Sequence, residues 1–406
     1  MRQITRFAAL LPLTVAACLA FGPAQAAEDG NVPTAASVPL DNAYLFLDKM
    51  MDKYHAGSTL RLVQSYVSTP KLQIDHIAFT YDNALVLLAY LARGTPDDMV
   101  RARVIGDAFI LLQSQAPVPD GRVLNSYYVS SAGKIGKDDN GADLGNVAWA
   151  GLALAQLYRK TNDAKYLDAA TSIADWAVKN TYTTKGFGGF LGGWTAKRTA
   201  IKWSSAEYNI DVNALFTILD AAGAAAPAGH TWAQLEAASS NYVQLHMWNA
   251  AGKYYWTGAD TSNSVVNKSL LPEDVQSWGY LAMPNAHSAA SLTWSTTALK
   301  GDGPYAGLSF SASDTSGVWF EGTAQTALAL KRRNQTGDAT LVAQYLASIE
   351  SAQVNGPHAD GQGIIAASKD GLSTGDGSDK YFSALHIGAT AWYALAKQNK
   401  NPLAPM

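Results

Sequence analysis

The chain has 406 residues, with 30 Lys and Arg, 33 Asp and Glu, and a formal net charge of −3. Its basic residues form no stripe, which argues against a nucleic-acid partner. Its only cysteine is Cys18, which excludes intramolecular disulfides, thiolate zinc sites and a cysteine nucleophile elsewhere in the chain. The seven histidines show no metal-ligand spacing, so we expect neither a metal nor another cofactor.

The first 26 residues have the pattern of a signal peptide. Arg2 and Arg6 form a positive start, residues 7–21 are apolar, and Ala24-Gln25-Ala26 is a small-x-small cleavage signal. We therefore expect an exported protein, either periplasmic or secreted.

The same segment allows a second interpretation. Val15-Ala16-Ala17-Cys18 resembles a lipid-attachment site, which would leave a lipoprotein anchored at Cys18. No later stretch approaches the ~20 apolar residues of a membrane span. Residues 27–40 have the composition of a flexible leader.

Amphipathic helix patterns with one charged face recur along the rest of the chain. A wide apolar stripe opposite a charged face is typical of a helix that covers a core. We expect these helices to form an outer layer; they are Asn42–Tyr54, Met99–Gln115, Lys165–Lys179, Thr231–Trp248 and Thr340–Gln353, with Ser288–Leu299 as a less regular sixth.

Between them lie six stretches that open on acids, amides or hydroxyls and then become apolar and rich in Ala and Gly. They are Tyr81–Leu85, Asp143–Trp149, Glu207–Asp211, Glu273–Trp278, Trp319–Gln325 and Tyr381–His386. Helices that are apolar all round are buried, so these six predict an inner ring. A helical hairpin repeated six times predicts an all-α (α/α)6 toroid over residues 41–398, with a tail at 399–406. The Gly-rich segments 184–194, 252–258 and 356–363 predict loops or short hairpins over the barrel mouth, which is the end where the inner helices begin.

Four carboxylates at this mouth are candidates for catalysis: Glu321, Glu207, Asp211 and Asp82. Glycoside hydrolysis needs one carboxylic acid to protonate the leaving oxygen and one carboxylate to activate water. Glu321 follows Trp319-Phe320, an apolar setting that raises the pKa of an acid. Glu207 and Asp211 are four residues apart and so share a helix face. Ordinary capping of helix N-termini is the alternative explanation for each of these acids.

Aromatic and polar residues beside these acids suit a sugar ligand, because the C–H face of a sugar stacks on aromatic rings and its hydroxyls form hydrogen bonds. The acidic run Asp138–Asp143 lacks the Gly spacing of a helix–loop–helix calcium site and predicts a turn. The candidate substrate-binding residues are Tyr81, Asn83, Asp143, Asn146, Trp203, Tyr208, Asp274, Trp278, Trp319, Gln325 and His386.

The inner-helix segments resemble the six-hairpin glycosidase superfamily, whose members are (α/α)6 barrels. The resemblance rests on Tyr81–Leu85, Gly145–Ala150, Tyr208–Asp211 and Trp319–Gln325, and it identifies no particular family. It implies an acid pair at the mouth of the inner helices and, for most members, inversion at the anomeric carbon.

Three functions remain open from the sequence. The first is a hydrolase of poly- or oligosaccharides. The second is a polysaccharide lyase with a Tyr or His base, for which Tyr81, Tyr208 and His76 are available. The third is a glycan-binding protein without activity, associated with exopolysaccharide. The export signal argues against an intracellular sugar epimerase with the same barrel.

Overall fold

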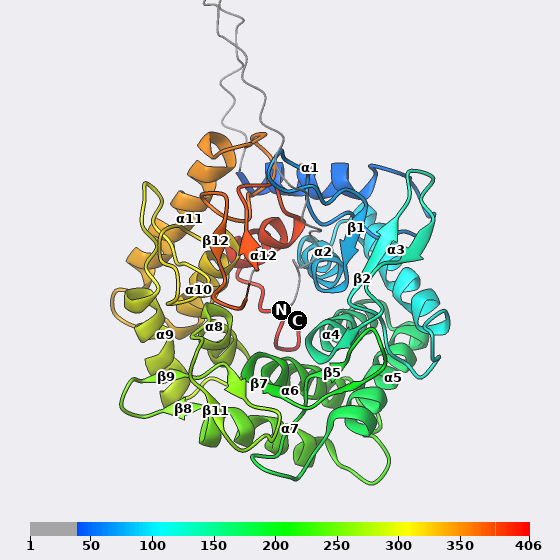
Figure 1. The fold of residues 1–406 in the computed structure, drawn as a ribbon. Helices are drawn as coiled ribbons and strands as arrows, with labels where there is room; N and C mark the ends of the chain where they lie inside the picture. The colour runs from blue at the N-terminus through cyan, green and yellow to red at the C-terminus, as the bar shows by residue number, and fades with distance from the viewer. Residues whose placement is uncertain (1–38, 378) are drawn as a thin grey trace, which may run out of the picture.

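The computed structural model describes residues 39–377 and 379–406, within which twelve α-helices form two concentric rings (Figure 1). The predicted signal peptide, the possible lipid anchor at Cys18 and nearly all of the predicted leader lie outside the described residues. The leader ends earlier than expected, because helix α1 already begins at Pro39.

The inner ring consists of every second helix, as the six-hairpin prediction requires. Each inner helix packs against the next, and the last packs against the first, which closes the ring. Their residues are buried on all sides over most of their length. The inner helices are α2 (Thr80–Arg93), α4 (Leu144–Thr161), α6 (Ala206–Ala221), α8 (Glu273–Ala282), α10 (Phe320–Arg333) and α12 (Ile387–Lys397).

The outer ring confirms the amphipathic patterns, including the uncertain sixth one at Ser288–Leu299. These helices are α1 (Pro39–Met51), α3 (Pro96–Ser114), α5 (Ala164–Thr181), α7 (Trp232–Asn241), α9 (Ala286–Ala298) and α11 (Asp338–Asn355). The helix expected over Thr231–Trp248 is shorter than predicted, because after Asn241 the chain forms a π-helical turn, Tyr242–His246. Tyr242 is buried there and its hydroxyl bonds to Ser204.

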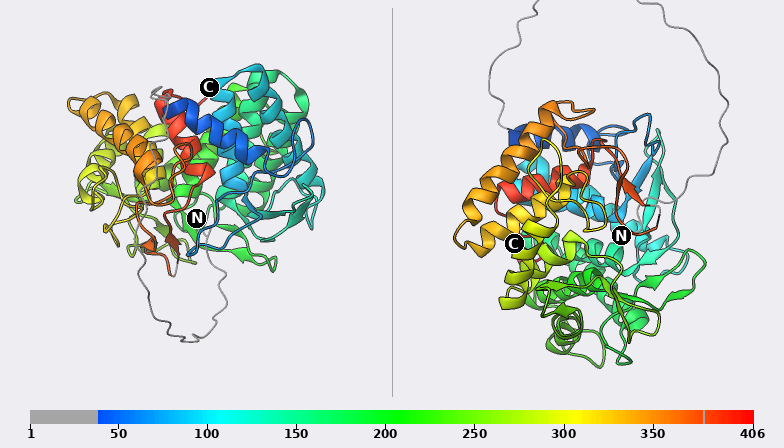
Figure 2. Two further views of the ribbon diagram at one scale, coloured as in Figure 1. Left: turned by 90° about the horizontal axis from the view of Figure 1, so that it is seen from above. Right: turned by 60° about the vertical axis from the view of Figure 1, so that its left-hand side comes forward.

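Short strands and long loops gather at one end of the barrel (Figure 2). They connect the end of each outer helix to the start of the next inner helix, so this end is the mouth. The strands form five small antiparallel sheets: β1–β2–β3 (Ile77–Phe79, Ser126–Val129, Ile135–Lys137), β4–β5–β6 (Ala142–Asp143, Gly193–Trp194, Ala200–Ile201), β7–β10–β11 (Ser204–Ser205, Gly258–Ala259, Val266–Asn267), β8–β9 (Trp248–Asn249, Tyr254–Tyr255) and β12–β13 (Leu372–Ser373, Lys380–Tyr381).

One hydrogen-bonding arrangement recurs at the start of five inner helices. The residue four positions after the N-cap bonds back to the N-cap carbonyl and also accepts a backbone N–H from the preceding loop. Because one polar side chain satisfies both partners, the loop is fixed over the helix start. The five residues are Asn83, Asn209, Gln276, Thr323 and Thr390.

The predicted tail packs across the barrel at the end opposite the mouth. The amide of Gln156 donates to the carbonyl of Ala404 at 2.7 Å, and the amide of Asn401 donates to the carbonyl of Leu281 at 2.8 Å. Leu403 is 1% exposed. The last residues therefore belong to the packed barrel, and the left-hand view of Figure 2 shows the C-terminus at the end away from the strands.

Candidate active site

The second residue of each inner helix faces the mouth, and three consecutive helices place a carboxylate there. An acid at this position is stabilised by the free N–H groups of the first helical turn. The six residues in ring order are Tyr81, Gly145, Glu207, Asp274, Glu321 and Gly388. Glu207, Asp274 and Glu321 come from separate inner helices, and the charge of Glu207 contributes to the raised pKa of each of the other two.

Glycines occupy this position in α4 and α12 because neighbouring side chains fill the space. A Cβ on Gly145 would lie 2.6 Å from the Tyr208 ring and 3.2 Å from Oδ2 of Asp211. A Cβ on Gly388 would lie 2.8 Å from Oδ1 of Asp82. The two glycines therefore leave room for candidate site residues that come from adjacent helices.

Four residues further into the barrel, alternate inner helices each contribute a tryptophan. The rings of Trp149, Trp278 and Trp392 meet with centroids 5.1 to 6.0 Å apart, and all three are fully buried. Tyr81 packs edge-on against Trp149 at 5.1 Å. This tryptophan layer closes the barrel beneath the acids. Trp278, predicted to bind substrate, is part of it.

Glu321 is 1% exposed and is held by three neighbours. The Tyr81 hydroxyl donates to its Oε1 at 2.6 Å, and the Gln325 amide donates to the same oxygen at 3.3 Å. Nδ1 of His386 lies 3.5 Å from Oε2. Burial raises the pKa of Glu321 to about 7, reinforced by the Asp82 charge and opposed by His386 and the Tyr81 hydrogen bond. At neutral pH this carboxyl group is therefore present in both its protonated and its ionised form.

His386 joins Glu321 to Asp82. Its Nε2 lies 3.1 Å from Oδ2 of Asp82, and its Nδ1 accepts the backbone N–H of Ala389, which caps α12. Tyr66 stacks on the imidazole with ring centroids 4.0 Å apart. Burial alone would lower the pKa of His386, but the charges of Asp82 and Glu321 raise it above the ordinary value. His386 lies before the helix, whereas the sequence pattern placed it within one.

Asp211 and Asp274 lie behind Glu207 and are completely buried. The indole of Trp149 faces Asp211, and its hydrogen bond opposes the rise in the pKa of that acid. Oδ2 of Asp274 has no hydrogen-bond partner among the described residues. Burial raises the pKa of both carboxyls well above the ordinary range, and the charge of Glu207 adds to the rise. These acids are therefore kept protonated by their surroundings and by one another.

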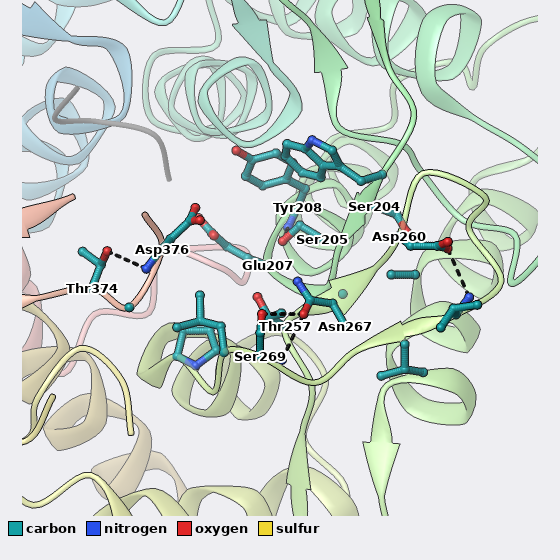
Figure 3. Close-up of a pocket in the computed structure, with 18 of the residues that line it drawn as sticks. Ser204, Ser205, Glu207, Tyr208, Thr257, Asp260, Asn267, Ser269, Thr374 and Asp376 are labelled. Carbon is teal, nitrogen blue, oxygen red and sulfur yellow. Dashed lines mark hydrogen bonds between the residues drawn. The ribbon is translucent and has the colours of Figure 1, made fainter. Parts of the chain in front are cut away.

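Glu207, which is 7% exposed, reaches an open cavity of about 530 Å³ at the mouth. Figure 3 shows it between the Thr374–Asp376 segment and the segment that carries Thr257, Asn267 and Ser269. Trp203 and Tyr208 also line this cavity, with their rings tilted and 5.7 Å apart. Trp203 is half-buried and Tyr208 is buried, and both present the aromatic surface expected beside a sugar.

Other predicted site residues have structural contacts. The side-chain N–H groups of Asn83 donate to the carbonyls of Val63 and Phe79, and its Oδ1 accepts the backbone N–H of Val63. No polar atom of this side chain is therefore left for a ligand. Asp143 is the N-cap position of α4, and Asn146 bonds to Asn125 at 3.3 Å while its own Oδ1 has no partner among the described residues.

Two further predictions concern the rim. Asp138 accepts the Ser126 hydroxyl, and Asp139 accepts the N–H of Gly141, so residues 138–141 form a loop that leads into strand β4 at Ala142–Asp143. Trp319 is buried between Phe310 and Tyr381 and is the N-cap of α10. It positions Glu321 two residues later.

Four residues of this region were not predicted from the sequence: Tyr66, Trp149, Trp392 and Asp376. Both tryptophans follow a glycine by four residues, in Gly145–Trp149 and Gly388–Trp392. That recurrence at two equivalent helix starts is a signal that could have revealed the tryptophan layer. Tyr66 and Asp376 come from loops and carry no such pattern.

Within residues 39–377 and 379–406, no three His, Cys, Asp or Glu side chains are arranged to hold a metal ion. None of the described helices has the length and hydropathy of a membrane span.

No family model matches the chain, and no curated protein does. Solved structures share its fold. A sugar epimerase from a ruminal bacterium superposes with a TM-score of 0.65 at 13% identity, covering 88% of this chain and 96% of the other. Cellobiose 2-epimerase from Bacillus thermoamylovorans superposes with a TM-score of 0.64 at 10% identity, covering 88% of this chain and 98% of the other. A family 76 glycoside hydrolase from a bovine Bacteroides thetaiotaomicron strain superposes with a TM-score of 0.60 at 13% identity, covering 89% of this chain and 77% of the other. These structures confirm the predicted (α/α)6 fold.

Proposed function

We propose that this protein is a glycoside hydrolase that acts on a poly- or oligosaccharide at the barrel mouth. The observation that carries the proposal is the pairing of Glu321, a buried acid with a pKa of about 7, with Glu207, a carboxylate on the wall of an open cavity. Two carboxyl groups in unlike surroundings are what acid–base cleavage of a glycosidic bond requires.

In the proposed reaction Glu321 donates its proton to the glycosidic oxygen as the bond from that oxygen to the anomeric carbon breaks. A water molecule attacks the anomeric carbon and gives its proton to Glu207, so that the products are a new reducing end and a free hydroxyl. Tyr81 positions Glu321 through its hydrogen bond, and His386 lies beside the carboxyl group. Inversion is the stereochemical outcome we propose, and export through residues 1–26 is part of the same proposal.

A sugar epimerase or isomerase is the second candidate. It is favoured by the Asp82–His386 pair, since an imidazole oriented by a carboxylate is a common base, and by the epimerases that share the fold. Against it, both nitrogens of His386 already have protein partners, Asp82 on one side and the N–H of Ala389 on the other. No lone pair is left to abstract a proton from a sugar, so we favour hydrolysis.

The test is incubation of the purified protein with a panel of neutral, acidic and amino polysaccharides and with reducing mono- and disaccharides. Reducing ends, ultraviolet absorbance and sugar composition are measured on the same samples. New reducing ends without absorbance support hydrolysis. Reducing ends with absorbance identify a lyase, and a new epimer or ketose without new reducing ends identifies the second candidate. Binding without any of these changes leaves a glycan-binding protein.

A further inference from the structure

The cavity at the mouth is acidic. Its lining includes the carboxylates of Glu207, Asp260 and Asp376, and the described residues that line it include no Lys, Arg or His. The lysines adjacent in sequence to lining residues are Lys202 and Lys268, and both are exposed. The Lys268 ammonium lies 5.8 Å from the centroid of the Trp256 ring. The lining therefore presents negative charge to whatever enters.

Two completely buried acids, Asp211 and Asp274, interact electrostatically with Glu207. Oδ2 of Asp274 is buried and lacks a hydrogen-bond partner among the described residues, whereas the indole N–H of Trp149 faces Asp211. Oδ2 of Asp211 points toward the start of α4, as its 3.2 Å distance from a Cβ on Gly145 indicates. A buried polar atom without a hydrogen-bond partner is costly unless a ligand or water supplies one.

We propose that the cavity binds a saccharide with free, protonated amino groups, that is, an oligomer of a de-N-acetylated hexosamine. This inference rests on the proposed function and names its substrate class. An ammonium group supplies up to three N–H donors and one positive charge, which the carboxylates lining the cavity match. Trp203 and Tyr208 supply apolar surface for the sugar ring.

The same charges discriminate against other sugars. A uronate would bring a carboxylate against Glu207 and Asp376 with no lining cation to neutralise it, and like charges brought together in an interface are costly. An N-acetylated sugar keeps the ring but loses the positive charge. The ligand class can therefore be tested with three oligomers of equal length.

The experiment measures binding by calorimetry at about pH 6, where a primary amine is protonated, with tetramers of glucosamine, N-acetylglucosamine and galacturonate. We expect the glucosamine tetramer to bind at least about tenfold more tightly than the other two. Its advantage should shrink as the ionic strength is raised from about 0.01 M to about 1 M, because salt screens the charges. Each tetramer is also assayed for cleavage in parallel.

Asp376→Asn is the variant that tests the lining, because Asp376 is exposed and lies outside the proposed acid pair. We expect about two- to fivefold weaker binding of the glucosamine tetramer, the range for one exposed charge pair. Asp168→Asn, on the exposed face of α5, is the matched control and should bind like the wild type.

The outcomes separate the inference from the proposed function. Selective binding of the glucosamine tetramer without cleavage supports the substrate class and counts against hydrolysis. Cleavage of a neutral or N-acetylated oligomer with no preference for the free amine overturns the substrate class and leaves hydrolysis in place. Equal binding of all three tetramers, no binding of any, or an unchanged affinity in Asp376→Asn overturns the inference.

Discussion

Glu273 offers a test of the electrostatics that does not depend on activity. It is the first residue of α8 and is completely buried. Its Oε1 accepts the hydroxyl of Thr326 on α10, and its Oε2 accepts the hydroxyl of Ser277 at 3.3 Å. Burial raises its pKa from an ordinary value of 4.5 to about 8. Glu273→Gln keeps the shape of the protonated acid and removes its titration.

The pKa shift fixes the sign of the pH dependence. Between about pH 4.5 and pH 8 the folded chain keeps a proton on Glu273 that the unfolded chain has released. The free energy of unfolding therefore falls by about 1.4 kcal/mol per pH unit over this window, and the total is at most about 5 kcal/mol. Glu321, Asp211 and Asp274 act in the same direction, since their pKa values are also raised.

Urea unfolding at a series of pH values from 4 to 9 measures the effect. We expect the unfolding free energy of Glu273→Gln to fall less steeply than that of the wild type, by about 1.4 kcal/mol per pH unit between pH 5 and pH 8. The unfolding free energy of Asp168→Asn, a change on the outer surface, should depend on pH in the same way as that of the wild type. Parallel curves for Glu273→Gln and the wild type would show that Glu273 does not titrate with a raised pKa, and the reasoning would be refuted.

Three further predictions concern the site and its support. His386→Asn should move the alkaline limb of the pH–rate profile to higher pH, because His386 lowers the pKa of Glu321 while Asn still caps α12; an unmoved limb would show that His386 does not act on Glu321. Trp278→Ala should cost about 3–5 kcal/mol in urea unfolding, because it empties the centre of the tryptophan layer; a cost below about 1 kcal/mol would contradict that packing. Gly388→Ala should cost about 1–3 kcal/mol in the same measurement and lower turnover, because its Cβ would meet Asp82; wild-type stability and turnover would contradict the geometry.

The helical part of the fold could be predicted because it follows from local patterns. Ala- and Gly-rich apolar helices such as Val147–Leu157 differ visibly from helices with one charged face such as Lys165–Lys179, and their alternation identifies the two rings. The prediction was least accurate where tertiary contacts decide the backbone. The π turn at Tyr242–His246 and the packing of residues 399–406 beneath the barrel depend on partners distant in sequence.

In the candidate site, too, some residues could be predicted from local sequence patterns and others could not. Glu207, Asp274 and Glu321 could be predicted because each occupies the same position of an inner helix. Asn83 also lies near the start of an inner helix, but its side chain holds the preceding loop by accepting the backbone N–H of Val63. The spacing of residues in the sequence does not reveal that contact. Asp376 lies in a loop between short strands, and only the fold brings it to the cavity that Glu207 lines.

The most direct test of the central claim is the rate of cleavage by Glu321→Gln on the substrate that the panel identifies, with binding measured on the same preparation. The amide keeps the hydrogen bonds to neighbours but has no acidic proton to donate. The account predicts that turnover falls by at least about 100-fold, the contribution typical of a general acid, while affinity for the oligosaccharide changes by less than about threefold. Turnover within about threefold of the wild type would show that Glu321 is not the acid and would contradict the proposed mechanism.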